Sequence, residues 1–272
     1  MDISGPIRDA LRRHVQPWSA ADHASPLFFL VRMVAFEEHP PSDMPAFLEQ
    51  DSAPLAGGHP RAMDANLGFA GVMRVLPRVN RALRADMEAA LRPQAQGLAD
   101  TAPALLASRS ATPADLLWRY WLLVLGQKRL GVSAPELLRR ALWRRAWSGQ
   151  KKEGFLHAGG PNDAFETAAY LDFAALHAAY NAIVFTQDYD LFPALQRLAD
   201  AHTAATQPDN ITQEPWALAA FAALDGTQSF APQQLHDATL ALSRLESPGQ
   251  SAIAALLADA VLTQEETAAG LG

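Results

Sequence analysis

The stretch that decides the fold is residues 159–180, GGPNDAFETAAYLDFAALHAAY. A Gly-Gly-Pro turn meets an acidic residue, Asp163, and a long run of apolar residues follows at once. A helix that is apolar around its whole circumference must be surrounded by protein. The stretch therefore predicts a buried helix that begins close to Asp163.

The same order of turn, acid and apolar segment recurs along the chain. Apolar segments follow five acids at steps of 42, 51, 48 and 46 residues, and a sixth begins near residue 250; the acids are Asp22, Asp64, Asp115, Asp163 and Asp209. Amphipathic or Ala-rich segments fall between them, at residues 79–91, 95–108, 135–147, 190–203 and 232–245. Alternation at this period is the signature of stacked helical hairpins.

The sequence predicts an all-α fold of about six helical hairpins. The β-branched residues are few and scattered, which argues against a sheet. We expect one α-helical repeat domain over residues 1–272, closed into an α/α-toroid, because neither terminal repeat has an obviously polar capping face. An open α-solenoid or an irregular helical bundle is the alternative, and residues 264–272 are predicted to be a frayed tail.

Composition excludes several classes of function. The 272 residues carry a formal net charge of −7, so we expect no nucleic-acid partner, because neutralising phosphates requires a dominant basic surface. There is no cysteine, which excludes disulfides and thiolate zinc sites. No apolar run of membrane-spanning length and no hydrophobic signal region occur, so the sequence predicts no transmembrane segment and a soluble, cytoplasmic protein.

Basic residues gather at residues 139–152. This run is interpreted as the solvated outer face of a helix, with an anionic partner or ligand as the alternative.

Two segments resemble the α/α-toroid repeats of terpenoid cyclases and protein prenyltransferases. Residues 161–168, PNDAFETA, are similar to the acidic segment that opens an inner helix in class II terpene cyclases. Residues 212–218, TQEPWAL, are similar to the Gln-Thr-Ala-Trp-Ala-Leu segment of squalene-hopene-type cyclases, and residues 57–60, GGHP, are a weaker third instance. The resemblance implies a central cavity that binds an apolar isoprenoid-type molecule, with acid-initiated cyclisation or isomerisation, the chemistry of an isomerase or a lyase.

The chain also departs from the motifs of these families. Aligned with the cyclase motif Asp-x-Asp-Asp it reads Asp163-Ala164-Phe165-Glu166, so that Phe165 stands where the central acid belongs. The cysteine that helps to hold zinc in prenyltransferases is missing, as is an Asp-Asp-x-x-Asp run for magnesium and diphosphate. We therefore expect no metal and no cofactor.

Asp163 and Glu166 are the candidate catalytic residues. At a spacing of three on a helix they share one face, and if they are enclosed together one carboxyl acquires a raised pKa and can act as a general acid. Glu166 is the expected proton donor and Asp163 its orienting partner. The alternative is a capping box with Asp163 at the N-cap, and Asp64, Asp115 and Asp209 at comparable helix starts favour this alternative.

Aromatic side chains on the predicted inner helices are the candidate substrate-binding residues. They are expected to line the cavity and to stabilise a carbocation through their π faces, with core filling as the alternative; they are Trp118, Trp121, Phe165, Tyr170 and Trp216. His157 and His177 are interpreted as isolated, because no helical spacing typical of a metal site occurs.

Two functions follow from these patterns. The first is a terpene cyclase-like protein, which predicts a deep, closed cavity with carboxylates at its wall. The second is a non-catalytic helical-repeat module that binds a protein partner, which predicts a filled axis and an exposed concave surface. A weaker third is an oxidase on a helical scaffold.

Overall fold

The computed structural model describes residues 1–15, 26–36, 60–157, 165–205, 214–226 and 229–270, and every regular element in these ranges is a helix. The even-numbered helices are α2 (Pro26–Ala35), α4 (Pro60–Val75), α6 (Pro113–Leu130), α8 (Phe165–Thr186), α10 (Leu218–Leu224) and α12 (Ala252–Gly270). The others are α1 (Ser4–His14), α5 (Arg81–Ala107), α7 (Glu136–Trp147), α9 (Phe192–Ala205) and α11 (Phe230–Leu242), with 3-10 turns η1 (Leu76–Arg78), η2 (Tyr189–Leu191) and η4 (Pro248–Gln250). The predicted all-α class is confirmed.

Burial follows the two helix types that the sequence distinguishes. Every residue of α12 from Ile253 to Thr263 is buried, and so is nearly all of α6 up to Gly126. By contrast, α7 buries only Leu142, Trp143 and Ala146. An apolar circumference therefore marks the interior helices, and an amphipathic one marks the exterior.

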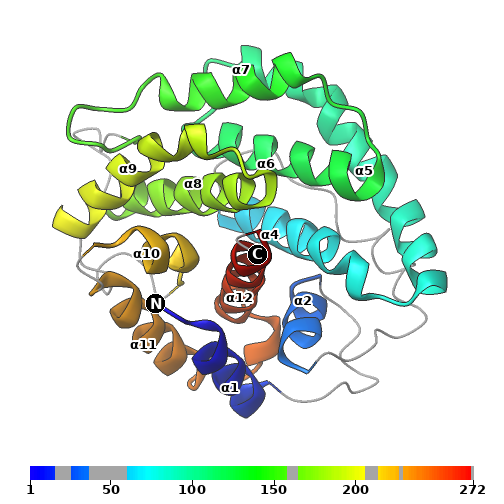
Figure 1. Cartoon of the computed structure of the whole chain (residues 1–272), viewed down its shortest axis with the longest axis vertical. Helices are drawn as coiled ribbons and strands as arrows, with labels where there is room; N and C mark the ends of the chain where they lie inside the picture. The colour runs from blue at the N-terminus through cyan, green and yellow to red at the C-terminus, as the bar shows by residue number, and fades with distance from the viewer. Residues whose placement is uncertain (16–25, 37–59, 158–164, 206–213, 227–228, 271–272) are drawn as a thin grey trace.

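The even-numbered helices contact one another in the order α2, α4, α6, α8, α10, α12 and back to α2. Helix α12 also contacts α4 and α8, and it lies in the middle of the view in Figure 1, with α5, α7, α9 and α11 toward the outside. The closed α/α-toroid stays a prediction, since a compact bundle makes neighbour contacts of the same kind.

Local signals set the ends of α6. The Thr112 hydroxyl accepts the Asp115 backbone N–H at 3.2 Å, and the Asp115 carboxylate accepts the Thr112 N–H at 2.9 Å, which makes a capping box. Asp115 is thus a capping residue, as the sequence suggested. The helix ends at Gly131, whose φ of 68° suits glycine.

Helix α5 is continuous where the sequence predicted two segments. Pro93 and Pro103 lie inside it, and both side chains are exposed. A proline removes one backbone hydrogen bond, but on the outer face water satisfies the carbonyl that is left free. The prolines therefore do not break the helix.

The C-terminal segment differs from the prediction of a frayed tail over residues 264–272. Helix α12 continues to Gly270, and side chains of its last turns have partners from distant parts of the chain. The Gln264 amide oxygen accepts the Ile3 backbone N–H at 2.9 Å, and Glu265 pairs with Arg8 of α1 and, at 2.6 Å, with Arg78 of η1. These contacts join both ends of the described chain, which is why the helix persists.

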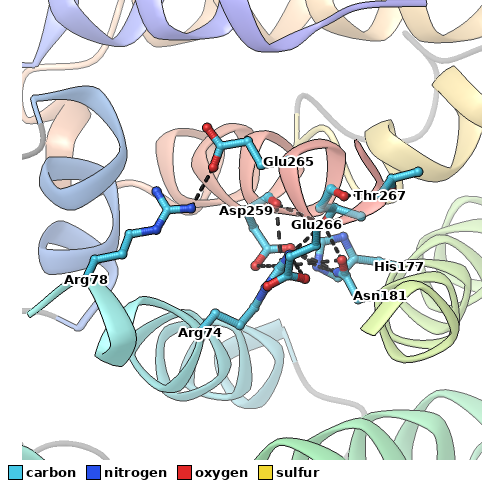
Figure 2. A network of polar contacts seen from close by, with 9 residues as sticks. Arg74, Arg78, His177, Asn181, Asp259, Glu265, Glu266 and Thr267 are labelled. Carbon is cyan, nitrogen blue, oxygen red and sulfur yellow. Dashed lines mark hydrogen bonds and ion pairs between the residues drawn. The ribbon is translucent and has the colours of Figure 1, made fainter. Parts of the chain in front are cut away.

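A buried polar network joins α4, α8 and α12 (Figure 2). Arg74 donates to Asp259 at 2.6 Å and to Glu266 at 2.9 Å, and its side chain has no exposed surface. Asn181 donates to the second Asp259 oxygen at 2.9 Å, and His177 lies 3.2 Å from the same oxygen. Burial raises the pKa of Asp259, but Arg74 and His177 oppose it and hold the pKa well below its usual value. The carboxylate is therefore ionised at neutral pH.

Removing Asp259 tests how far the fold depends on this network. We expect Asp259→Ala to lower the free energy of unfolding by about 3–5 kcal/mol, because a buried guanidinium loses its closest counter-ion. Glu136→Ala is the matched control, since it breaks the exposed Glu136–Arg140 pair and should cost less than about 1 kcal/mol. Urea denaturation at neutral pH measures both. Equal losses would contradict the dependence of the fold on the buried pair.

Candidate functional site

The predicted acid pair lies at the edge of the described structure. Glu166 belongs to the first turn of α8, which begins at Phe165. The side chains of Phe165 and Glu166 lie outside the described part, as do Asp163 and Asp209 altogether. The general acid and the capping box at this position both stay predictions.

Three of the predicted aromatic residues come together. Trp118 of α6 and Trp216 meet edge to face with ring centroids 6.0 Å apart, and Tyr170 of α8 meets Trp216 in the same way at 5.9 Å. His177 joins them, stacked on Trp118 at 5.6 Å and edge-on to Trp216 at 5.3 Å. We call these four side chains the aromatic cluster. Trp118 is 1% exposed and Trp216 is fully buried, so these rings pack on one another in the core, and Tyr170 is the partly exposed member of the cluster.

Trp121 belongs to a neighbouring position. Its ring contacts Phe185 at 5.3 Å, and the Arg74 guanidinium lies 5.9 Å from its centroid. The side chain is fully buried and packs against Phe185 and the Arg74 guanidinium of the polar network. Core filling is the better description of Trp121.

Asp64 is the acid that the structure adds to the site. It lies one turn inside α4, four residues after Pro60, so its predicted role as a helix cap is wrong. One carboxyl oxygen, Oδ1, is buried and has no hydrogen-bond partner among the described residues. Burial, reinforced by the negative charge of Glu214, raises the pKa of Asp64 to about 6. A carboxyl in this state can hold a proton close to neutral pH.

Glu214 and Tyr170 connect Asp64 to the aromatic cluster. The Trp216 indole N–H donates to a Glu214 carboxylate oxygen at 2.8 Å, in the turn that precedes α10. The Tyr170 hydroxyl is buried and has no hydrogen-bond partner in the described part of the chain. Burial, with the nearby charges of Glu214 and Asp64, raises the pKa of Tyr170, so its hydroxyl stays protonated. Two buried polar atoms, Asp64 Oδ1 and the Tyr170 hydroxyl, therefore lack hydrogen-bond partners in the described part of the chain, and Tyr170 lies beside the ring of Trp216.

The polar network around Arg74 bounds the site of Asp64 and the aromatic cluster on the side that faces the interior. Asp64 and Arg74 are ten residues apart on α4, about 15 Å along the helix axis. Tyr170 and Asn181 are separated similarly on α8, so both helices run from the site toward the network. The buried side chains of the network fill the space between α4, α8 and α12.

The histidines are not isolated, contrary to their interpretation from the sequence. Apart from His177, two of them share Asp172 of α8: His157 Nδ1 lies 2.5 Å and His202 Nε2 3.0 Å from its carboxylate oxygens. Burial raises the pKa of Asp172, but the hydrogen bonds from His157 and His202 outweigh it and lower the pKa overall. This cluster ties the segment before residue 158 to α8 and α9.

No group of three or more potential metal ligands occurs among the described residues. A pocket of about 270 Å³ lies where the segment before α1 meets α8, α10 and α12, and four of its ten lining residues are alanine. Its polar members, among them Thr263 and Gln264, are already hydrogen-bonded within the protein. Neither feature offers reactive chemistry.

One helical segment of the described chain, Thr167–Thr186 in α8, has the length and apolar composition to cross a membrane. Inside the fold 78% of that segment is buried, as in a core helix.

Comparison with known proteins gives no assignment. No protein-family model, no curated protein and no solved structure matches the chain. The function must be argued from the site itself.

Sequence reasoning missed three members of this site, Asp64, Glu214 and His177. Glu214 stands two residues before Trp216, so its place beside that indole carried a local signal. His177 lies seven residues after Tyr170, two helical turns along the same face. For Asp64 the only signal was its position before an apolar run, which equally suggests a cap.

The Asp64→Asn variant tests whether the raised pKa of the Asp64 carboxyl affects stability. Its folded pKa of about 6 exceeds the ordinary 3.8, so its stabilising contribution is complete below pH 3.8 and is lost as the pH rises through 6. Asparagine mimics the protonated form. We expect the variant to gain about 1–2 kcal/mol in unfolding free energy at pH 7.5, allowing for partial exposure, and less at pH 4.5.

The measurement is denaturant unfolding at both pH values, with Asp86→Asn on the exposed face of α5 as the control. The control should behave as the unmodified protein at both. A loss of stability in Asp64→Asn at pH 7.5 would show that Asp64 is an ordinary paired carboxylate.

Proposed function

We propose that the chain is a closed α/α-toroid with a ligand site at one end of its ring. The cyclic order of contacts among the even-numbered helices supports closure. The parallel course of α4 and α8, from the site to the polar network, supports an inner ring whose helices begin at one end. The filled layer around Arg74 confines the site to that end.

The proposed function is that of a terpene cyclase-like protein, which binds an apolar isoprenoid-type molecule against the aromatic cluster. One observation carries it: Asp64 is half-buried, its buried oxygen Oδ1 has no hydrogen-bond partner among the described residues, and it is near enough to Glu214 and Tyr170 of that site for their charges to interact. A buried polar group of this kind is satisfied when a ligand supplies its partner.

The chemistry that suits Asp64 is proton donation to an oxygen. With a pKa of about 6 the carboxyl carries its proton mainly below pH 6, and the raised pKa also makes it a weaker acid, so a plain alkene is a poor acceptor. An isoprenoid epoxide is a better one: the Asp64 proton goes to the epoxide oxygen, a C–O bond breaks, and a double bond of the same molecule attacks the resulting cation. Loss of a proton from a neighbouring carbon completes a cyclised or rearranged alcohol.

The aromatic cluster supports the same reaction. The π faces of Trp118 and Trp216 can stabilise a passing carbocation, and the Glu214 carboxylate supplies a nearby negative charge. The proposed reaction needs no metal and no cofactor. The proposal includes a cytoplasmic location, and the net charge of −7 supports the absence of a nucleic-acid partner.

A non-catalytic helical-repeat module is the second candidate, and the filled axis favours it. In that case the protein partner would be bound by the outer surface. Helix α7 is the best-placed element, because Leu137 is 83% exposed there and Arg140 and Arg144 are also exposed. An exposed large apolar residue beside arginines is typical of an interaction surface.

Turnover of an epoxide tests the proposal. The purified protein is incubated with farnesol and with its 10,11-epoxide, and products are separated by gas chromatography and identified by mass spectrometry. We expect conversion of the epoxide alone, and a loss of about a hundredfold or more in rate for Asp64→Asn. Quenching of tryptophan fluorescence should show that this variant still binds the epoxide.

Two further variants locate the donor. Asp86→Asn should turn over normally, because its carboxyl is remote from the cluster on α5. If Glu166→Gln abolishes turnover while Asp64→Asn does not, the donor is the acid at the start of α8. Absence of both product and fluorescence change would overturn the isoprenoid proposal in favour of the interaction module.

A further inference from the structure

A second pocket lies on the outer side of the molecule, between α6, α7 and η2. Its volume is about 230 Å³, room for about eight water molecules at ~30 Å³ each. The aromatic rings of Tyr120 and Trp143 form its floor, with centroids 5.2 Å apart and an angle of 59° between the rings. Each of these side chains is only 7% exposed, so the floor is fixed by the core behind it.

Charged side chains of opposite sign line the pocket. Arg140 and Arg144 come from α7, where a spacing of four residues puts them on one face. Asp188 and Asp190 come from η2 and the residue before it. All four side chains are exposed, and among the described residues no ion pair joins the two arginines to the two aspartates.

The floor lies within reach of both charges. Burial is the largest cause of the raised pKa of the Tyr120 hydroxyl. The charge of Asp188 raises this pKa further, whereas those of Arg139 and Arg140 lower it, so charges of both signs act on the hydroxyl. A ligand packed on Tyr120 and Trp143 would therefore lie near the positive charges of α7 and near the negative charges at η2.

We propose that this pocket binds a small zwitterion with an apolar group, of the class of a free amino acid with an apolar side chain. Its carboxylate would meet the Arg140 and Arg144 guanidinium groups, which bind carboxylates with two parallel hydrogen bonds. Its ammonium group would meet Asp188 and Asp190, and its side chain would pack on the rings below.

Simpler ligands fit the same walls less well. A phosphate or another anion without a positive group is repelled by Asp188 and Asp190, and a plain cation is repelled by Arg140 and Arg144. Arg140 already pairs with Glu136, and an isoprenoid alcohol would offer no counter-charge to Arg144, Asp188 or Asp190. Only a ligand with both charges satisfies the pocket, and this site is independent of the acid site around Asp64.

L-phenylalanine is the probe, and binding is measured by isothermal titration calorimetry on the full chain. We expect saturable binding of L-phenylalanine. N-acetyl-L-phenylalanine, which lacks the ammonium group, and L-phenylalanine methyl ester, which lacks the carboxylate, should each bind at least about tenfold more weakly. Equal binding of the three compounds, or no binding of L-phenylalanine, would overturn the proposal.

Variants place the binding in this pocket. Arg144→Gln and Asp190→Asn should each weaken L-phenylalanine binding by about tenfold or more, because each removes one charged partner. Arg92→Gln, on the exposed face of α5, is the matched control and should bind normally. Thermal unfolding checks that all three variants fold alike. Unchanged affinity in both pocket variants would rule this pocket out.

Discussion

The buried charge of Arg74 is the constraint on which the interior depends. A guanidinium without solvent costs several kcal/mol unless its donors meet acceptors in good geometry. It donates to Asp259 and Glu266 on α12 and to Asn181 on α8. One side chain of α4 therefore binds two other helices. A slide or rotation of any of the three would leave a charge unpaired. The network therefore fixes their register more narrowly than apolar packing alone.

The same network holds the aromatic cluster in place through His177. One imidazole nitrogen of His177 lies against Asp259, while its ring stacks on Trp118 and meets the edge of Trp216. The orientation of the aromatic faces thus follows from a hydrogen bond below them. If the cluster binds a ligand as proposed, this support from the polar network keeps its shape fixed beforehand, which lowers the cost of binding.

The helices were predictable because their burial is encoded in local composition, and the polar contacts were not because their partners are remote. Arg74 and Asp259 are separated by 185 positions, and Gln264 and Ile3 by 261, so no local pattern links them. The apolar stripe of α12 fades after Leu262, which is why the sequence predicted fraying there. The clustering of Trp118, Tyr170 and Trp216 could be anticipated, but the pairing of each histidine could not.

Asp64 and Asp259 look alike in the sequence, yet the fold shifts the pKa values of their carboxyl groups in opposite directions. Asp259 meets Arg74, which lowers its pKa, whereas burial, reinforced by the charge of Glu214, raises the pKa of Asp64 to about 6. The first carboxylate strengthens the folded state at neutral pH and the second weakens it. Perturbed acids concentrate at functional sites, because catalysis needs a proton that is held near the working pH. The site around Asp64, whose charge lowers stability at neutral pH, is therefore the best place to test for catalysis.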